Sequence, residues 1–396
     1  MDSEEVTPIY EQDSTAVVRP TNLAEENTKY FSNGDTHENR KRRTQYLIPI
    51  KTKTGGGANS QYERFKKAII LAMLTNRTLV LTPFFLHGGH VRGLNLDHLR
   101  SFKDTFDVEM LSELLPVATV EEYRKVCNRG NTKAIGWKVD QSDYETNAVD
   151  FFGNIMDIEL PGADALKSFQ TGCQLDEVIS ELGDATCVAF STSGYLGLPL
   201  GGPEQREEML RTVMKYLWRS LKIRKVVDVM TEDICHGEPY LAFHWRNKSS
   251  EMPCFFGRDK SKDRCESIVR EVRKLAHRAS DAVSELMEQE HIKCIYVACP
   301  LWSLEIVDIL AKRIPRNRII VSEDLPIPES DKAFVEDYYI MSLVEQEVAY
   351  RAAIFVAAGY SNWSDFVTEG REVAEKITYD IRELAQIPED VNKMMI

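Results

Sequence analysis

The second half of the chain alternates short apolar runs with helical patterns, and this alternation constrains the fold more than any other feature. The apolar runs lie at 240–246, 293–299, 318–322 and 352–359. The helical patterns between and after them lie at 266–289, 303–313, 335–351 and 364–374. Apolar runs of this kind are typical of strands buried on both faces of a parallel sheet. We therefore predict an α/β domain with helices on both sides of its sheet.

The first half begins with a similar unit. A short strand is predicted at 46–50, a glycine-rich loop at 51–61, a helical pattern from residue 62 to residue 76, and a further strand at 77–85. The apolar residues of the helical pattern recur at helical spacing: Phe65, Ala68, Ile69, Ala72 and Met73. This order predicts a βαβ unit. Short helices are expected at 102–123 and a helix at 204–220, and the region to about 160 reads as rich in loops.

The 396 residues exceed what one hydrophobic core usually holds. We predict a disordered tail or stalk at 1–44, an N-terminal Rossmann-like domain at 45–221, and a C-terminal Rossmann-like domain at 222–396. The tail is polar and aperiodic and ends in the basic run "RKRRT". Two βα domains facing a cleft is the predicted architecture.

Composition narrows the classes of function. The net charge of -13 argues against nucleic acid as a general partner. No apolar run approaches the roughly 18 residues that span a bilayer, so no membrane span is expected in this chain. The acidic, polar start is unlike a signal peptide, which leaves a cytoplasmic location or a missing leader or anchor as alternatives.

The cysteines are eight in number, and none form a CxxC pair, which argues against a zinc cluster. Cys254 and Cys265 flank a charged loop, and either a disulfide between them or free buried thiols would fit.

Three polar groups follow predicted strands, where ligands bind in open α/β sheets. The glycine loop at 55–59 lets backbone approach a ligand, although a tight turn would explain its glycines equally well. His244 and Arg246 follow the strand of 240–246; Arg246 offers a guanidinium fork for phosphate, or else a salt bridge between domains. The stretch 361–364, "SNWS", opens a helix and can be an anion site or an ordinary N-cap.

Other chemistries fit the sequence less well. The loop is no Walker motif, and no DxD motif for a metal-bound sugar nucleotide occurs. His87 and His90 have the spacing of metal ligands but lack an obvious third ligand, so no metal site is predicted. The stretch "AFSTSGYLG" resembles a nucleophile elbow but has Ser191 where the first glycine belongs.

The three groups together resemble the motifs of the GDP-fucose protein O-fucosyltransferases. The first motif reads "GGGANSQYERFKKAIILAMLTNRTLVLTP", the second "HWRN" and the third "IFVAAGYSNWSDFV", and all three occur in the family's order between about 45 and 375. Glu345, sixteen residues before Ser361, matches an acidic position of the family, where aspartate is usual. The resemblance implies a GT-B fold of two Rossmann-like domains with the nucleotide sugar in the cleft. The domain at 45–221 would lie on the acceptor side, and the domain at 222–396 would bind the nucleotide sugar.

The resemblance also implies a set of residues that bind the nucleotide sugar, namely Gly56, Gly57, Ala58, Asn59, His244, Arg246, Glu345, Ser361, Asn362, Trp363 and Ser364. Arg246 would bind the diphosphate and stabilise its developing charge, and with Asn59 it would form the catalytic pair. His244 would help to hold the nucleotide, and Asn59 with the Gly57 backbone would approach sugar and phosphate. The stretch 361–363 would hold the β-phosphate.

Glu345 would read the N–H edge of guanine. One branch of the family has a glutamate base where Gly56 stands here. The base is therefore absent, supplied elsewhere, or unnecessary.

The function that this resemblance implies is an inverting, metal-independent transfer of fucose from GDP-fucose to a serine or threonine hydroxyl of a protein acceptor, with no cofactor. A fucosyltransferase that acts on a glycan and a non-catalytic relative that binds a GDP-sugar are the alternatives. The family resemblance implies the lumen of the secretory pathway, in the endoplasmic reticulum or Golgi.

Overall fold

The computed structural model describes residues 44–50, 58–86, 99–145, 152–153, 156–170, 174–192, 203–246, 262–359 and 361–387. The predicted tail at 1–44 lies outside these residues except for Thr44, and so do Gly56 and Gly57 of the glycine loop and His87 and His90. Residues 44–396 form one compact unit. The predicted boundary between residues 221 and 222 stays a prediction.

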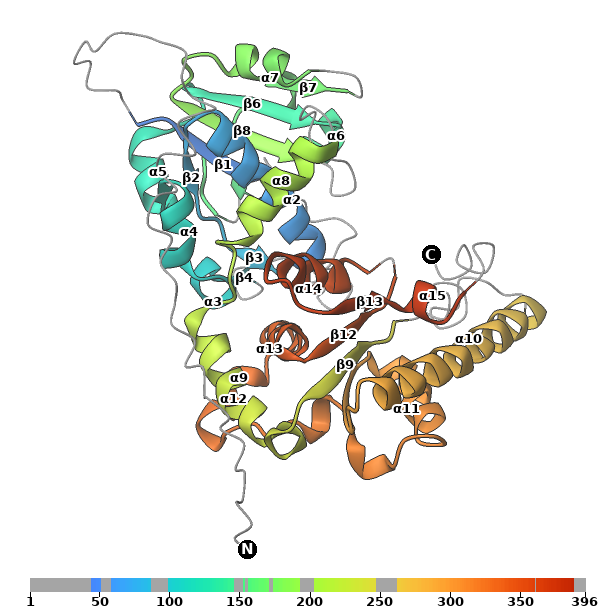
Figure 1. The fold of residues 1–396 in the computed structure, drawn as a ribbon. Helices are drawn as coiled ribbons and strands as arrows, with labels where there is room; N and C mark the ends of the chain where they lie inside the picture. Colours follow the sequence, from blue (N-terminus) through green and yellow to red (C-terminus); the bar gives the residue numbers. More distant parts are fainter. Residues whose placement is uncertain are drawn as a thin grey trace, which may run out of the picture. The chain divides into compact units, whose positions relative to one another are not determined.

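Two parallel sheets organise this unit (Figure 1). The first sheet has the order β5-β2-β1-β8-β6-β7. Its strands are β1 (Tyr46–Ile50), β2 (Thr78–Val80), β5 (Val117–Ala118), β6 (Thr132–Trp137), β7 (Leu166–Phe169) and β8 (Cys187–Thr192). Every pairing within it is parallel. The helices that accompany this sheet are α2 (Ala58–Leu74), α3 (Phe102–Thr105), α4 (Val108–Leu114), α5 (Val120–Val126), α6 (Gln141–Tyr144), α7 (Leu175–Leu182) and α8 (Pro203–Met214).

The second sheet has the order β11-β10-β9-β12-β13, again with parallel pairings throughout. Its strands are β9 (Tyr240–His244), β10 (Cys294–Ala298), β11 (Ile319–Ile320), β12 (Ile354–Ala357) and β13 (Thr378–Asp380). Its helices are α9 (Leu221–Asp233), α10 (Lys262–Gln289), α11 (Glu305–Leu310), α12 (Lys332–Val335), α13 (Tyr338–Arg351), α14 (Asn362–Val373) and α15 (Ile381–Leu384). The alternation predicted for the second half is confirmed.

Side chains that alternate along the central strands divide between two apolar layers. Leu241, Phe243 and Trp245 pack with α10 and α11, whereas Tyr240 and Ala242 pack on the opposite face with α13 and α14. Figure 1 shows these helix pairs on opposite sides of the second sheet. The layer on the α13 side continues into the apolar residues of α2 and α8, so helices of both sheets share one core. This shared layer brings α2 beside α13 and α14.

One sequence expectation about the first half was incomplete, and another was wrong. The stretch to residue 160, expected to be rich in loops, also contains β5 and the six-residue strand β6. The helix expected at 204–220 ends at Met214, and a separate helix, α9, begins at Leu221. Ser220 interrupts the helical pattern because its hydroxyl accepts from the Ile223 backbone N–H at 3.4 Å and caps the new helix.

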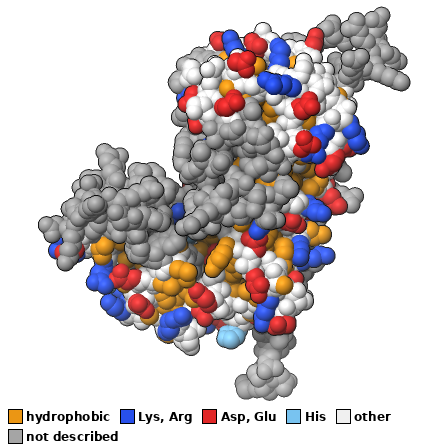
Figure 2. Space-filling model, turned by 180° about the vertical axis from the view of Figure 1, so that it is seen from behind, with side chains coloured by type: hydrophobic (Ala, Val, Ile, Leu, Met, Phe, Trp, Pro, Cys, Tyr) orange, Lys and Arg blue, Asp and Glu red, His pale blue; other side chains and the backbone are white. Residues whose placement is uncertain are grey.

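Two sequence expectations concern nucleic acid as a partner and a membrane span. Lys, Arg, Asp and Glu are interspersed on the described surface of the face in Figure 2, and the net charge is -13. The absence of a nucleic-acid partner stays a prediction. Among the described residues, no helix combines the length and the apolar character needed to cross a bilayer.

Two disulfides tie the amino ends of buried strands to preceding helical segments. Cys187, the first residue of β8, bonds to Cys127 after α5, and Cys294, the first residue of β10, bonds to Cys235 after α9. The sequence did not indicate either pair. The suggested Cys254–Cys265 pair cannot be compared, because Cys254 and the side chain of Cys265 lie outside the described residues. Cys299 is a free thiol.

Removal of either disulfide should lower the free energy of unfolding by about 4 kcal/mol, because each bond closes a loop of roughly 60 residues in the unfolded chain. Denaturant titrations of Cys235→Ala/Cys294→Ala and of Cys127→Ala/Cys187→Ala would measure this loss. Cys299→Ala is the matched control, and its effect should be much smaller. Unchanged stability of both double variants, and of the wild-type protein in reductant, would contradict the disulfide assignment.

Candidate functional site

The strand order of the second sheet places two predicted motifs at one edge. From β9 the chain passes to β10 and β11 on one side and then returns to β12 on the other side. The carboxyl ends of β9 and β12 therefore flank the point where the strand order reverses, which is where open α/β sheets bind ligands. His244 ends β9, and α14 starts at Asn362 shortly after β12.

His244 is buried at this edge as a neutral imidazole. Its ring Nδ1 lies 2.6 Å from Ser364 Oγ, and its ring centroid lies 4.2 Å from that of Trp363. Burial and, to a smaller extent, the positive charge of Arg246 lower the pKa of His244 to about 3. Ser364 Oγ also accepts from the Ala358 backbone N–H at 3.1 Å. This arrangement favours a Ser364 hydroxyl that donates to Nδ1, which leaves the imidazole proton on Nε2 as a donor.

Arg246 is half-buried, two residues beyond His244. Trp245, between them, is 5% exposed and packs in the opposite apolar layer with Phe243. The alternation of side chains along an extended strand thus directs Trp245 into the core, opposite to its two neighbours. The guanidinium of Arg246 lies close enough to His244 to lower the pKa of its imidazole.

The start of α14 presents a hydroxyl that the protein leaves unsatisfied. Ser361 is 2% exposed, and its Oγ has no hydrogen-bond partner within the described residues. It makes no side-chain cap to the helix, although such a residue usually does. A buried hydroxyl without a partner costs about 1–3 kcal/mol. Together with the N–H groups of the first turn, it forms a ready cradle for an anion.

The first turn of α2 is hydrogen-bonded to the same region. Asn362 Nδ2 donates to Ser60 Oγ at 2.9 Å, and Gln346 Nε2 donates to Asn59 Oδ1 at 2.9 Å. Asn59 and Ala58 are half-buried at the start of the helix. The first and third motifs therefore meet directly through the hydrogen bond between Asn362 and Ser60.

Glu345 of α13 lies apart from this group, beside β10 rather than beside β9 and β12. Its Oε1 accepts from Tyr296 OH of β10 at 2.8 Å. Burial raises the pKa of the Glu345 carboxyl, while hydrogen bonds from Tyr296 and Ser322 oppose the rise. Cys299 lies beside it after β10, and burial raises the pKa of this thiol to about 12. Glu345 thus faces the carboxyl ends of β10 and β11.

Sequence reasoning missed the residues that hold the site together. Gln346 and Ser342 of α13 bind Asn59 and the Trp363 indole N–H respectively. Arg219 is 3% exposed and donates to Gln346. The available signal was a glutamine at helical spacing from Tyr339 and Leu343 in the pattern of 335–351, which alone does not name a partner.

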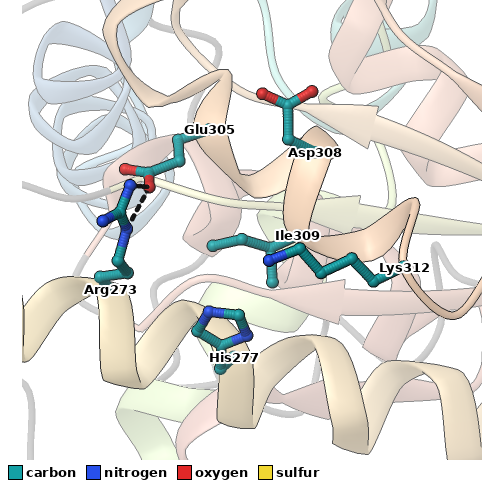
Figure 3. A pocket seen from close by; sticks show the side chains of 6 residues that line it. All are labelled: Arg273, His277, Glu305, Asp308, Ile309 and Lys312. Atoms are coloured by element: carbon teal, nitrogen blue, oxygen red, sulfur yellow. Dashed lines mark hydrogen bonds and ion pairs between the residues drawn. The ribbon is translucent and has the colours of Figure 1, made fainter.

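A groove between α10 and α11 is a separate feature (Figure 3). Its volume is about 450 Å³, and it is lined by Arg273, His277, Glu305, Asp308, Ile309 and Lys312. Arg273 pairs with Glu305 across it, and both side chains are about half exposed or more, at 62% and 48%. None of the predicted site residues lines this groove. Within the described residues, no cluster of three His, Cys, Asp or Glu side chains could hold a metal ion.

Comparisons with known proteins identify the family of the chain. The model of the GDP-fucose protein O-fucosyltransferases matches residues 46–374. The chain belongs to this family. No curated protein sequence matches the chain. POFUT1 in complex with GDP-fucose is similar over 87% of this chain and 99% of that chain, with 16% identity and a TM-score of 0.58. The apo form of POFUT1 is similar over the same shares, with 16% identity and a TM-score of 0.56.

The similarity to POFUT1 shows the fold. The chain is an α/β protein of the GT-B-like class, as predicted. Membership of the O-fucosyltransferase family associates the chain with fucosyl transfer from GDP-fucose. The individual site residues stay predictions, which the geometry above makes testable.

The buried neutral imidazole predicts a specific pH dependence. The folded-state pKa of His244 lies below its unfolded value of 6.5, so the unfolded chain binds a proton first as the pH falls. The stabilising contribution of neutral His244 is complete above pH 6.5 and is lost on the way to pH 3. At pH 5 this loss is about 2 kcal/mol.

His244→Gln should therefore remove about 2 kcal/mol of the acid destabilisation that wild-type protein shows between pH 7 and pH 5. Urea titrations at both pH values measure the free energy of unfolding of each protein. The contributions of groups other than His244 cancel when the two proteins are compared. His277→Gln, at an exposed position on α10, is the control and should not change the pH dependence. Parallel pH profiles of wild type and His244→Gln would contradict the buried neutral state.

Proposed function

We propose that the protein transfers fucose from GDP-fucose to a serine or threonine hydroxyl of a protein acceptor, with inversion at the anomeric carbon and without a metal ion. The observation that carries this proposal is the unsatisfied Ser361 hydroxyl at the reversal of strand order, where β9 also ends two residues before Arg246. Family membership and the similarity to POFUT1 in complex with GDP-fucose support the donor.

The reaction breaks the bond between the fucose anomeric carbon and the β-phosphate oxygen. Negative charge then grows on the departing GDP, while the sugar passes through an oxocarbenium-like state. Arg246, Ser361 and the first-turn N–H groups of α14 would stabilise that charge, and one preorganised donor of this kind is typically worth about 3–4 kcal/mol. These fixed charges and dipoles take the role that a metal would otherwise have. The acceptor hydroxyl would attack from the opposite face and release its proton.

Glu345 is the proposed reader of guanine. It is an acidic group at the carboxyl ends of β10 and β11, where the base would lie if the diphosphate rests at β12. Tyr296 and Ser322 hydrogen-bond to its carboxyl group. A carboxylate has lone pairs for further donors, so it could also accept from guanine N1–H and N2–H.

The disulfides support a location in the lumen of the secretory pathway. Disulfides persist in oxidising compartments and are rare in the cytosol. Cys127–Cys187 and Cys235–Cys294 are both internal to the fold. A cytoplasmic location is the alternative.

The test of the function is mass spectrometry of protein and glycan acceptors after incubation with GDP-fucose. We expect a fucose added to a serine or threonine of a protein substrate, no transfer from ADP- or UDP-sugars, and activity that survives EDTA. Fucose on a glycan would favour the glycan-modifying alternative. Binding of GDP-fucose without hydrolysis or transfer would favour a non-catalytic relative. Activity lost in EDTA and restored by manganese would overturn the metal-independent mechanism.

Arg246 provides the sharpest variant. Arg246→Ala should lower kcat at least about 100-fold, since it removes one preorganised donor to the leaving group. Arg246→Lys keeps the charge but loses the planar fork. Its kcat should therefore lie between that of Arg246→Ala and that of the wild-type protein. The thermal midpoint of both should fall by less than about 2 °C, equivalent to roughly 1 kcal/mol.

If Arg246 instead stabilises the fold through a salt bridge, Arg246→Ala should lower the free energy of unfolding by about 3–5 kcal/mol. Activity would then fall only in proportion to the loss of folded protein. Turnover and melting temperature measured on the same preparation distinguish the two roles.

A further inference from the structure

Gln346 joins three parts of the protein through one buried carboxamide. It lies on α13 and is 1% exposed. Its Nε2 donates to Asn59 Oδ1 at 2.9 Å and to the Trp363 carbonyl oxygen at 3.0 Å. Its Oε1 accepts from the guanidinium of Arg219. The start of α2, the start of α14 and the segment before α9 therefore meet at this side chain.

The orientation of the Gln346 carboxamide follows from its partners. An arginine guanidinium can only donate, so the atom that faces Arg219 must be oxygen. A backbone carbonyl can only accept, so the atom that faces the Trp363 carbonyl must be nitrogen. Both conditions hold for one orientation and fail for the flipped one. The Gln346 amide is thus fixed by groups whose own polarity cannot change.

Arg219 is itself held firmly. Its guanidinium carbon lies 4.0 Å from the ring centroid of Phe366 and 4.9 Å from those of Tyr62 and Phe106. Burial lowers the pKa of Arg219, but an arginine remains charged in proteins. The aromatic rings favour the cation and keep it in place. A charged donor is therefore always presented to Gln346 Oε1.

The orientation of the Gln346 carboxamide determines that of the Asn59 carboxamide. Since Gln346 offers it an N–H, Asn59 must accept through Oδ1, and its Nδ2 is turned away from Gln346. Within the described residues, Nδ2 of Asn59 has no partner. The Nδ2 group is therefore the part of Asn59 left to serve a ligand, as a donor to an oxygen of a phosphate or of a sugar.

We propose that Gln346 is a positioning residue that sets Asn59 as an N–H donor to the nucleotide sugar. The inference rests on the proposed function, since it concerns the same site. It goes beyond that function because it assigns the polarity of one contact and names the side chain, remote from the ligand, that fixes this polarity.

The test is a substitution that preserves shape and reverses polarity. In Gln346→Glu, the carboxylate still accepts from Arg219, but it can no longer donate to Asn59. The Asn59 carboxamide should then flip, donate to the new carboxylate and turn its oxygen toward the ligand. We expect kcat to fall about 10- to 100-fold, as for a reacting group that is misplaced. The melting temperature should change little, because Arg219 gains a charged partner while the Trp363 carbonyl oxygen loses its donor.

Two further variants separate positioning from general stability. Asn59→Asp should lose at least as much activity as Asn59→Ala, because a carboxylate cannot donate. Tyr240→Phe is the matched control: it removes the buried hydrogen bond from Tyr240 OH, at the amino end of β9, to the Val348 carbonyl oxygen of α13 at 2.7 Å. It should lower the melting temperature without a change in kcat.

A double-mutant cycle gives the decisive result. In the Asn59→Ala background, Gln346→Glu should cause no further loss of kcat or of GDP-fucose affinity, measured by calorimetry. Multiplicative losses in that background, or wild-type turnover in Gln346→Glu alone, would overturn the inference while leaving the proposed function intact. A wild-type protein that neither binds nor turns over GDP-fucose would overturn both.

Discussion

The pairing of β9 with both β10 and β12 is the constraint on which the site depends. It places the carboxyl end of β9 beside that of β12, so that His244 and the start of α14 are neighbours although they are 120 residues apart in the chain. Parallel strands direct their carboxyl ends to one edge, and the Cys235–Cys294 disulfide lies at the opposite, amino edge of the same sheet. The amino edge of the second sheet is thereby covalently tied to the segment after α9.

The buried helix α13 is the second element on which this arrangement rests. Most buried helices offer only apolar side chains, but α13 carries Tyr339, Glu345 and Gln346 into the interior. Each finds a partner on a different element: Tyr62 of α2, Tyr296 of β10, and Asn59 with Arg219. A buried polar group without a partner is costly, so these contacts favour a single arrangement of α2, α13 and α14. Specific geometry at the site follows from satisfied polarity within the core.

The sequence was sufficient to predict the alternating strands and helices of the second half of the chain, because apolar runs and helical spacing reflect burial directly. It was also sufficient to recognise the three motifs. It was insufficient for β6, in which Lys133 interrupts the apolar pattern, and for the break before α9, which depends on the cap at Ser220. The disulfide partners and Gln346 were unreadable for a different reason: each depends on residues about 60 to 290 positions away. Sequence position indicates that a polar residue is unusual, but only the tertiary structure identifies the group that satisfies it.

The most direct measurement of the central claim is the structure of the protein with bound GDP. We expect the β-phosphate to lie at the reversal of strand order between β9 and β12. It should be within hydrogen-bond distance of Ser361 Oγ and of the first-turn N–H groups of α14, and the Arg246 guanidinium should bind the same phosphate. GDP bound in the groove between α10 and α11, or a phosphate out of reach of both Arg246 and Ser361, would contradict it.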